Sequence, residues 1–129
     1  MTTKILIIED NEQNLYLMKF LLEKNGFDVE VARDGVEGIE AAALLRPAAI
    51  LLDIQIPIMD GYAVAKALRK QPMLDRTPII AVTSYAMVGD KERILASGAT
   101  GYIEKPINPD TFVDEIREHL HLSESGGQS

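Results

Sequence analysis

The stretch Ala49-Ile50-Leu51-Leu52-Asp53 decides the fold, because four consecutive apolar residues end in a carboxylate. An apolar run of this length, bounded by polar residues, is typical of a parallel strand that is buried on both faces. Three more runs have the same form and also end in reactive side chains: Ile5-Leu6-Ile7-Ile8 before Glu9-Asp10, Ile79-Ile80-Ala81-Val82 before Thr83-Ser84, and Gly101-Tyr102-Ile103 before Glu104-Lys105-Pro106.

A fifth strand-like segment, Phe27-Asp28-Val29-Glu30-Val31, alternates apolar and charged residues. Alternation is expected where one face of a strand meets water, so we expect this strand at an edge of the sheet and the continuous runs inside it. Helix-like stretches follow each of the five segments. The chain is therefore predicted to be an α/β protein of five βα units around a mainly parallel sheet.

The helices are expected at residues 11–25, 36–45, 60–70 and 84–97, and from the Asn108-Pro109 pair onward, with 71–77 as a polar connection. Capping residues and a proline at the first helical position set these limits. Apolar residues at helical spacing mark the buried face of the first and last helices: Leu15, Met18 and Leu22, then Phe112, Ile116 and Leu120. We expect one domain over residues 1–122 and a disordered tail over 123–129.

Composition excludes several classes of protein. The 129 residues fit one domain with a sizeable core, and the absence of cysteine excludes disulfides and thiolate metal sites. The net charge is −7, with 20 acidic against 13 basic residues and no basic stripe, which argues against direct nucleic-acid binding. The first apolar run is too short for a signal peptide or a membrane span, so we expect a cytoplasmic protein without a membrane segment.

Residues after the strands are expected to meet at one rim, because ligands of open α/β sheets bind outside the carboxyl ends of the strands. Glu9, Asp10 and Asp53 would repel one another there unless a hard cation such as Mg²⁺, which prefers oxygen ligands, joined them. A carboxylate can attack a phosphoryl group and carry it. Lys105 and Mg²⁺ would balance the charge of that group, and the Thr83 hydroxyl would donate a hydrogen bond to it.

Each of these residues also has an ordinary structural interpretation. Glu9 and Asp10 could simply favour the start of the next helix, Thr83 could cap one, and Lys105 could be a solvated lysine. The combined pattern favours phosphoryl chemistry, because equivalent positions after separate strands all carry reactive groups. His119 and His121 are two residues apart on a helix and do not face each other, so we expect ordinary surface histidines.

Taken together, these residues make the chain resemble the receiver domain of bacterial two-component response regulators, from Lys4 to about Leu122. Within that family it is most similar to stand-alone receivers of the cell-division type. The resemblance implies a flavodoxin-like (βα)5 fold with strand order 2-1-3-4-5 and helices on both faces. It is carried by four motifs: Ile7-Ile8-Glu9-Asp10-Asn11, the eleven residues from Leu51 to Gly61, Ala81-Val82-Thr83-Ser84, and Tyr102-Ile103-Glu104-Lys105-Pro106.

The resemblance implies a role for each rim residue. Asp53 is the expected phosphoacceptor, and Lys105 is the lysine that pairs with the phosphate. Glu9 and Asp10 are the expected metal-binding pair, with Asp10 the more direct ligand, and the backbone carbonyl of Gln55 is a further ligand. Mg²⁺ is the implied cofactor, and Mn²⁺ is expected to substitute for it. A cis bond is expected between Lys105 and the proline that follows it.

The resemblance also implies a switch. Thr83 is the expected switch hydroxyl, and Tyr102 is the aromatic that turns inward on activation, reshaping the face of the fourth helix, fifth strand and fifth helix for a downstream protein. The phosphoryl donor is a histidine kinase or a phosphotransfer protein. The protein is expected to be a monomer or a weak dimer that depends on phosphorylation. In the family the side chains of Gln55 and Tyr85 affect how long the phosphate lasts.

Three rival interpretations remain. A phosphatase of the haloacid-dehalogenase type expects a second acid two residues after the nucleophile, where this chain has Gln55. A flavodoxin-like flavin carrier needs a glycine- and hydroxyl-rich loop after the first strand, where this chain has Glu9-Asp10-Asn11-Glu12. A receiver that only docks, without phosphorylation, is the third. The favoured interpretation is a signalling receiver that is not an enzyme beyond its own phosphorylation and dephosphorylation.

Overall fold

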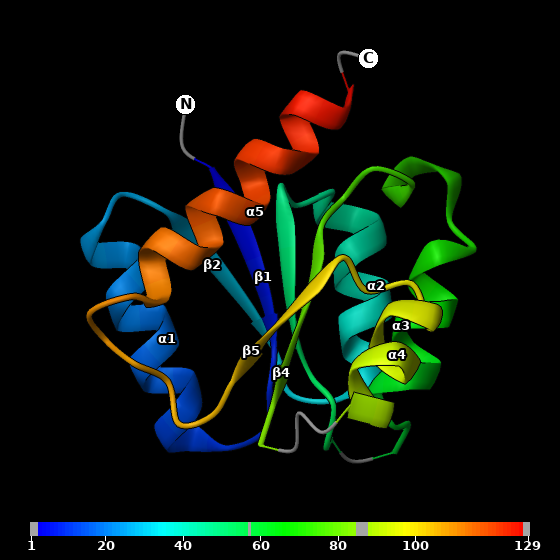
Figure 1. Cartoon of the computed structure of the whole chain (residues 1–129), viewed down its shortest axis with the longest axis horizontal. Coiled ribbons are helices and arrows are strands. Elements are labelled where there is room, and N and C mark those ends of the chain that lie inside the picture. Colours follow the sequence, from blue (N-terminus) through cyan, green and yellow to red (C-terminus); the bar gives the residue numbers. More distant parts are fainter. Residues whose placement is uncertain (1–2, 57, 85–87, 128–129) are drawn as a thin grey trace.

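The computed structural model describes residues 3–56, 58–84 and 88–127, which form one five-stranded sheet covered by helices (Figure 1). The elements follow the chain as strands and helices in alternation: β1 (Lys4–Ile8), α1 (Glu12–Lys24), β2 (Asp28–Ala32), α2 (Gly35–Leu45), β3 (Ala49–Asp53), α3 (Gly61–Arg69), a short 3-10 helix η1 (Pro72–Leu74), β4 (Ile79–Thr83), α4 (Val88–Ala96), β5 (Gly101–Glu104) and α5 (Phe112–Gly127).

All five strands pair in parallel, in the order β2-β1-β3-β4-β5. The predicted fold and the edge position of the alternating strand are therefore confirmed. The expectation that the continuous runs all lie inside the sheet is wrong for the last one, because β5 forms the other edge. α1 and α5 cover one face of the sheet, and α2, α3 and α4 cover the other (Figure 1). Within the described residues no helix is both long enough and apolar enough to cross a bilayer.

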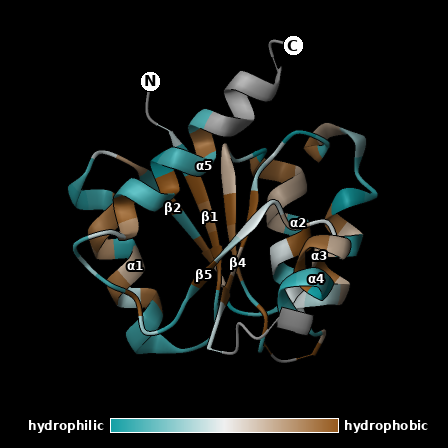
Figure 2. Ribbon diagram, in the orientation of Figure 1, coloured by the Kyte–Doolittle hydropathy of each residue, from teal (hydrophilic) through white to brown (hydrophobic). Residues whose placement is uncertain are grey.

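The continuous apolar runs feed two cores, one on each face of the sheet, because neighbouring strand residues point to opposite sides. Leu6, Ile50 and Leu52 pack under α2, α3 and α4, whereas Ile5, Leu51 and Val82 pack under α1 and α5. The central strands accordingly carry the most hydrophobic residues (Figure 2). A strand buried on both faces has no wet position, which explains why these runs lack alternation.

Three helices begin at side-chain caps that hold a backbone N–H of the first turn. Asn11 accepts from the N–H of Asn14, Asp34 from that of Glu37 and Asp60 from that of Ala63, each at 2.9 Å. Asp60 thus caps α3 at the position where the sequence predicts a helix to begin. Since these caps stand two to seven residues after a strand, they also fix the loops at the carboxyl ends of the sheet.

Two helix starts differ from the prediction. α4 begins at Val88 rather than Ser84, and residues 85–87 lie outside the described part of the chain. α5 begins at Phe112 and is preceded by a turn that Asn108 closes: its side chain accepts the N–H of Asp110 at 3.0 Å, and its carbonyl accepts that of Phe112 at 3.0 Å. α5 continues through Gly127, and the division into a domain ending at 122 and a tail over 123–129 stays a prediction.

The connection over residues 71–77, predicted to be polar, contributes a buried apolar side chain to the core. It contains η1, and the Leu74 side chain is completely buried in the core beneath α3. Arg69 holds this segment in place, because its guanidinium donates to the carbonyls of Leu74 at 2.6 Å and of Gly98 at 2.8 Å. The connection is thus part of the packed domain.

Candidate functional site at the carboxyl ends of the strands

The strand register brings the predicted site residues to one rim. Ile8 pairs with Leu52, Asp53 with Val82, and Thr83 with Glu104. The residue after each strand therefore lies beside the residue after its neighbour. This rim is at the lower edge of the sheet in Figure 1, opposite both chain termini.

Three carboxylates meet at the rim. Glu9, Asp10 and Asp53 each offer an oxygen, and these atoms lie within 4.8 Å of one another. Glu9 is fully buried and Asp53 is 4% exposed, whereas Asp10 is open to solvent. The three acids therefore lie together at the rim, as predicted. Buried carboxylates so close together need a positive charge nearby.

Lys105 supplies one such charge. Its Nζ lies 3.3 Å from Glu9 Oε1 and 3.3 Å from Asp53 Oδ1, and its side chain is largely buried. The lysine reaches this position directly after β5, where the bond between Lys105 and Pro106 is cis as predicted. A single ammonium thus serves two carboxylates.

Backbone N–H groups of the following loops contact the same acids. Gln55 donates its N–H to Asp53 Oδ1 at 3.0 Å, and Asn11 donates its N–H to Glu9 Oε2 at 3.3 Å. Glu9 Oε1 is completely buried and has no hydrogen-bond partner among the described residues, although the Lys105 ammonium is near it. The cluster is therefore only partly satisfied by the protein itself.

The burial of Glu9 has an electrostatic consequence. Removal from water, together with the hydrogen bond and the negative charge of Asp53, raises the pKa of Glu9 from 4.5 to about 7. Lys105 and the N–H of Asn11 act in the opposite direction but do not cancel the rise. Near neutral pH, the pocket therefore resists a full set of charged carboxylates.

The donor set fits a hard divalent cation. All the ligand atoms are oxygens, the three acids are close enough to share one ion, and one buried oxygen lacks a hydrogen-bond donor. Mg²⁺ binds such oxygens readily and keeps some of its waters, which the exposed side of Asp10 allows. The role of the Gln55 carbonyl as a ligand stays a prediction.

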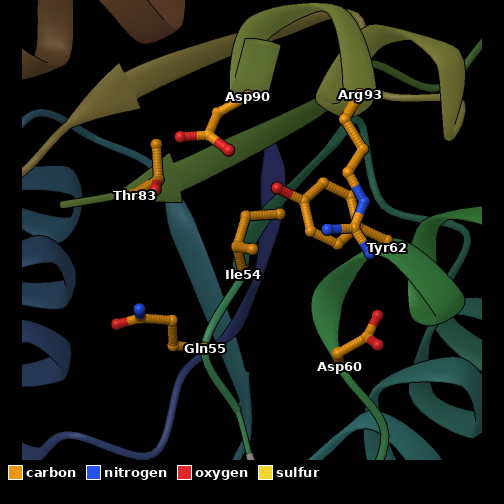
Figure 3. A pocket seen from close by; sticks show the side chains of 7 residues that line it. All are labelled: Ile54, Gln55, Asp60, Tyr62, Thr83, Asp90 and Arg93. Atoms are coloured by element: carbon orange, nitrogen blue, oxygen red, sulfur yellow. The ribbon is translucent and has the colours of Figure 1, made fainter. Parts of the chain in front are cut away.

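Thr83 ends β4 and is 4% exposed. It lines a groove of about 310 Å³ between α3 and α4, shown in Figure 3, together with Ile54, Gln55, Asp60, Tyr62, Asp90 and Arg93. In this groove the Arg93 guanidinium stacks 3.9 Å from the centroid of the Tyr62 ring. Thr83 therefore borders the groove between α3 and α4.

Tyr102 lies one strand over from Thr83. Its ring is half-buried against the core beneath α4, and the Lys91 Nζ lies 5.3 Å from the ring centroid. The contact with Tyr102 raises the pKa of the exposed Lys91 ammonium. Tyr85, predicted to affect phosphate lifetime, lies outside the described residues.

Sequence reasoning missed two features of the rim. The groove residues Tyr62, Asp90 and Arg93 carry no signal beyond ordinary helix composition, because their meeting depends on how α3 and α4 pack. Ile58, in the loop between β3 and α3, has a φ of +76° and an exposed side chain. Nothing in an isoleucine predicts that conformation, since β-branched residues avoid it.

Comparison with known proteins finds receiver domains of response regulators. The family model described as the response regulator receiver domain matches residues 5–117. The polar-differentiation response regulator DivK of Brucella ovis is 41% identical over 93% of this chain and 98% of its own length.

Solved structures give the same result. The chemotaxis response regulator CheY4 of Vibrio cholerae has a TM-score of 0.89 and 31% identity, covering 92% of this chain and 99% of its own. The receiver domain of sensor histidine kinase PA1611 from Pseudomonas aeruginosa, solved with a magnesium ion coordinated in its active-site cleft, has a TM-score of 0.86 and 31% identity, covering 94% and 99%.

Proposed function

Because this chain belongs to the response regulator receiver family of two-component systems, we propose that Asp53 is its phosphoacceptor and that a histidine kinase or phosphotransfer protein is its donor. The family is a signalling family and not a class of enzymes acting on separate substrates. The observation that carries the proposal is the Lys105 ammonium, placed 3.3 Å from both Asp53 and Glu9 at the rim. That arrangement holds a nucleophilic carboxylate beside a fixed cation.

The chemistry follows from these contacts. An oxygen of Asp53 attacks the phosphorus of the donor's phosphohistidine, the phosphorus–nitrogen bond breaks, and its electron pair stays on the ring nitrogen. The product is an aspartyl-phosphate on Asp53. Lys105 then pairs with a phosphoryl oxygen, and the Thr83 hydroxyl donates a hydrogen bond to another.

Glu9, Asp10 and Asp53 would hold Mg²⁺ together with the Gln55 carbonyl, and we propose that Mn²⁺ substitutes for it. When bound, the ion supplies positive charge against the phosphoryl oxygens. Glu9 would offer a buried carboxylate, and Asp10, the more direct ligand of the pair, would offer an exposed one. The only catalysis we propose is self-phosphorylation from small phosphodonors and self-dephosphorylation.

The acceptor assignment is tested by intact-mass measurement after treatment with acetyl phosphate and Mg²⁺. We expect one added phosphate on the wild type, none when EDTA replaces Mg²⁺, and none on Asp53→Asn. Asp28→Asn is the matched control, because Asp28 is paired with Lys4 at the opposite end of the sheet. An Asp53→Asn protein that gains the same mass would refute the assignment.

We also propose that Thr83 and Tyr102 form the switch. When Thr83 moves toward the phosphate, the Tyr102 ring turns into the space behind it and changes the surface of α4, β5 and α5, where a downstream protein docks. The unphosphorylated form is proposed to be a monomer, with at most a weak dimer on phosphorylation. We propose that the phosphoryl transfer takes place in the cytoplasm and that the protein binds neither nucleic acid nor membrane.

Thr83→Ala tests the switch, because it removes the hydroxyl and keeps the acceptor. We expect this variant to gain one phosphate from acetyl phosphate, but to show a smaller change than wild type in the Tyr102 ring resonances when beryllofluoride is added. Ser84→Ala, one residue further along and exposed, is the control and should respond as wild type. An equal response in Thr83→Ala and wild type would place the switch elsewhere.

A further inference from the structure

Ile58 combines two unfavourable features. Its φ of +76° lies in the left-handed region, and its side chain is 76% exposed. Among the described residues other than glycine, only Arg46 shares a positive φ, and Arg46 is the C-terminal cap of α2. A β-branched residue in this conformation is a genuine outlier, because its Cβ substituents crowd the backbone.

The loop around Ile58 enforces that conformation. The N–H of Ile54 donates to the carbonyl of Val82 at 3.2 Å, and the N–H of Gly61 donates back to the carbonyl of Ile54 at 2.9 Å. A Cβ on Gly61 would lie 2.5 Å from the Cα of Ile54, so the two ends of the loop touch. Asp60 then starts α3 at once by capping the N–H of Ala63. These contacts fix both ends of the loop.

The other apolar residues that the structure describes in this loop pack inward. Ile54 and Ile56 are buried, and Met59 packs so closely on the first turn of α2 that a Cβ on Gly35 would lie 3.1 Å from the Met59 Cβ. Ile58 is the exception, since its side chain leaves the core. Asparagine or glycine would suit this backbone better and would expose no apolar surface. The stability of the domain therefore gives no reason for isoleucine here.

The position of the loop suggests the reason. It joins the carboxyl end of β3 to the start of α3, at the lower edge of the molecule in Figure 1, and Ile58 follows Asp53 by five residues. Any protein that delivers a phosphoryl group to Asp53 must approach this rim. Strained residues that persist because their surroundings enforce them cluster at binding and catalytic sites.

We propose that Ile58 is a specificity residue for the protein phosphodonor, contacting an apolar side chain beside the donor's phosphohistidine. This inference rests on the proposed function of Asp53. Asp60, two residues further along, and Asp10, in the acidic cluster with Asp53, are both exposed, so Ile58 adds an apolar contact to a charged rim. Such a contact rejects donors that would bury a charged or polar group against it. A small phosphodonor makes no such contact and does not need it.

The test compares two donors on four proteins. The protein donor is the fastest of the source organism's purified, autophosphorylated histidine-kinase domains and phosphotransfer proteins toward the wild type, and the small donor is acetyl phosphate with Mg²⁺. The variants are Ile58→Asn, which tolerates a positive φ, and Ile58→Leu, which keeps the apolar surface. Leu44→Gln is the matched control, because Leu44 is 85% exposed at the end of α2 far from the rim.

We expect Ile58→Asn to lower kcat/KM for the protein donor about tenfold, the loss of one good interface contact. For Ile58→Leu and Leu44→Gln, kcat/KM for the protein donor should stay within about twofold of the wild-type value, because neither variant loses this apolar contact. All four proteins should react equally with acetyl phosphate. The midpoint of thermal unfolding should rise by about 3 °C in Ile58→Asn, because strain is relieved.

Three outcomes would overturn the inference. Ile58→Asn keeps wild-type transfer from the protein donor, or it loses the reaction with acetyl phosphate to the same degree, or no protein donor phosphorylates a wild type that acetyl phosphate does phosphorylate. Failure of acetyl phosphate to modify the wild type would instead overturn the proposed role of Asp53.

Discussion

The interior of the sheet and the rim at its carboxyl ends bury opposite kinds of group. In the interior, the residues of β1, β3 and β4 before the rim are, apart from Lys4, all apolar and buried. Of the four polar side chains buried among the described residues, Glu9, Asp53 and Thr83 lie at the rim. The fourth, Ser97, follows α4 directly and donates to the carbonyl of Ile94 at 2.6 Å.

The contrast shows where stability is gained and where it is given up. Each interior side chain adds apolar burial, the main favourable contribution to folding. The rim instead holds two carboxylates on one lysine, a buried oxygen without a hydrogen bond, and a β-branched residue in a left-handed conformation. Groups that oppose folding persist where a reaction or a partner needs them.

The largest effect is expected in the interior. Phe112→Ala should lower the free energy of unfolding by about 3–5 kcal/mol, because Phe112, at the start of α5, is completely buried in the core and its loss leaves a cavity. Urea unfolding followed by circular dichroism measures this. The rim variant Thr83→Ala, by comparison, should change it by no more than about 1 kcal/mol, the worth of a typical hydrogen bond. Equal decreases in the free energy of unfolding for Phe112→Ala and Thr83→Ala would contradict the contrast between the interior and the rim.

A smaller effect should appear as a pH dependence at the rim. The folded protein raises the pKa of Glu9 from 4.5 to about 7, so between these values the folded state binds more protons than the unfolded state. The stability that Glu9 contributes is therefore complete below pH 4.5 and is lost as the pH rises through about 7.

Glu9→Gln isolates this contribution, because glutamine does not titrate. Measured without metal, the stability of wild type minus that of Glu9→Gln should fall as the pH rises over that window and level off above it. A difference between wild type and Glu9→Gln that stays constant with pH would show that Glu9 titrates normally.

Most of the fold was predictable because its signals are local. The apolar runs mark strands wherever the chain folds, and the alternation of Phe27 to Val31 placed that strand at an edge. Other features depend on packing. Leu74 is buried by α3 in a connection too short to show periodicity. Asn108 begins a turn instead of a helix, because the same side chain suits both structures.

The site was predictable by a different route. Positions after parallel strands must share a rim, so Glu9, Asp10, Asp53, Thr83 and Lys105 were predicted from strand ends. Their burial was not, because the depth of Glu9 depends on the elements that close over it. The conformation of Ile58 was also beyond prediction, since the loop closure enforces it against the preference of the residue.

The most direct test of the contrast is the urea midpoint of wild type and Asp53→Asn, each in EDTA and in saturating Mg²⁺. Without metal, Asp53→Asn should be the more stable protein, because one of two buried like charges is gone while its oxygen still accepts from Gln55. Mg²⁺ should then raise the urea midpoint of wild type more than that of Asp53→Asn, so that the difference between the two midpoints narrows or reverses. A less stable Asp53→Asn in EDTA, with Mg²⁺ raising both midpoints equally, would contradict the account.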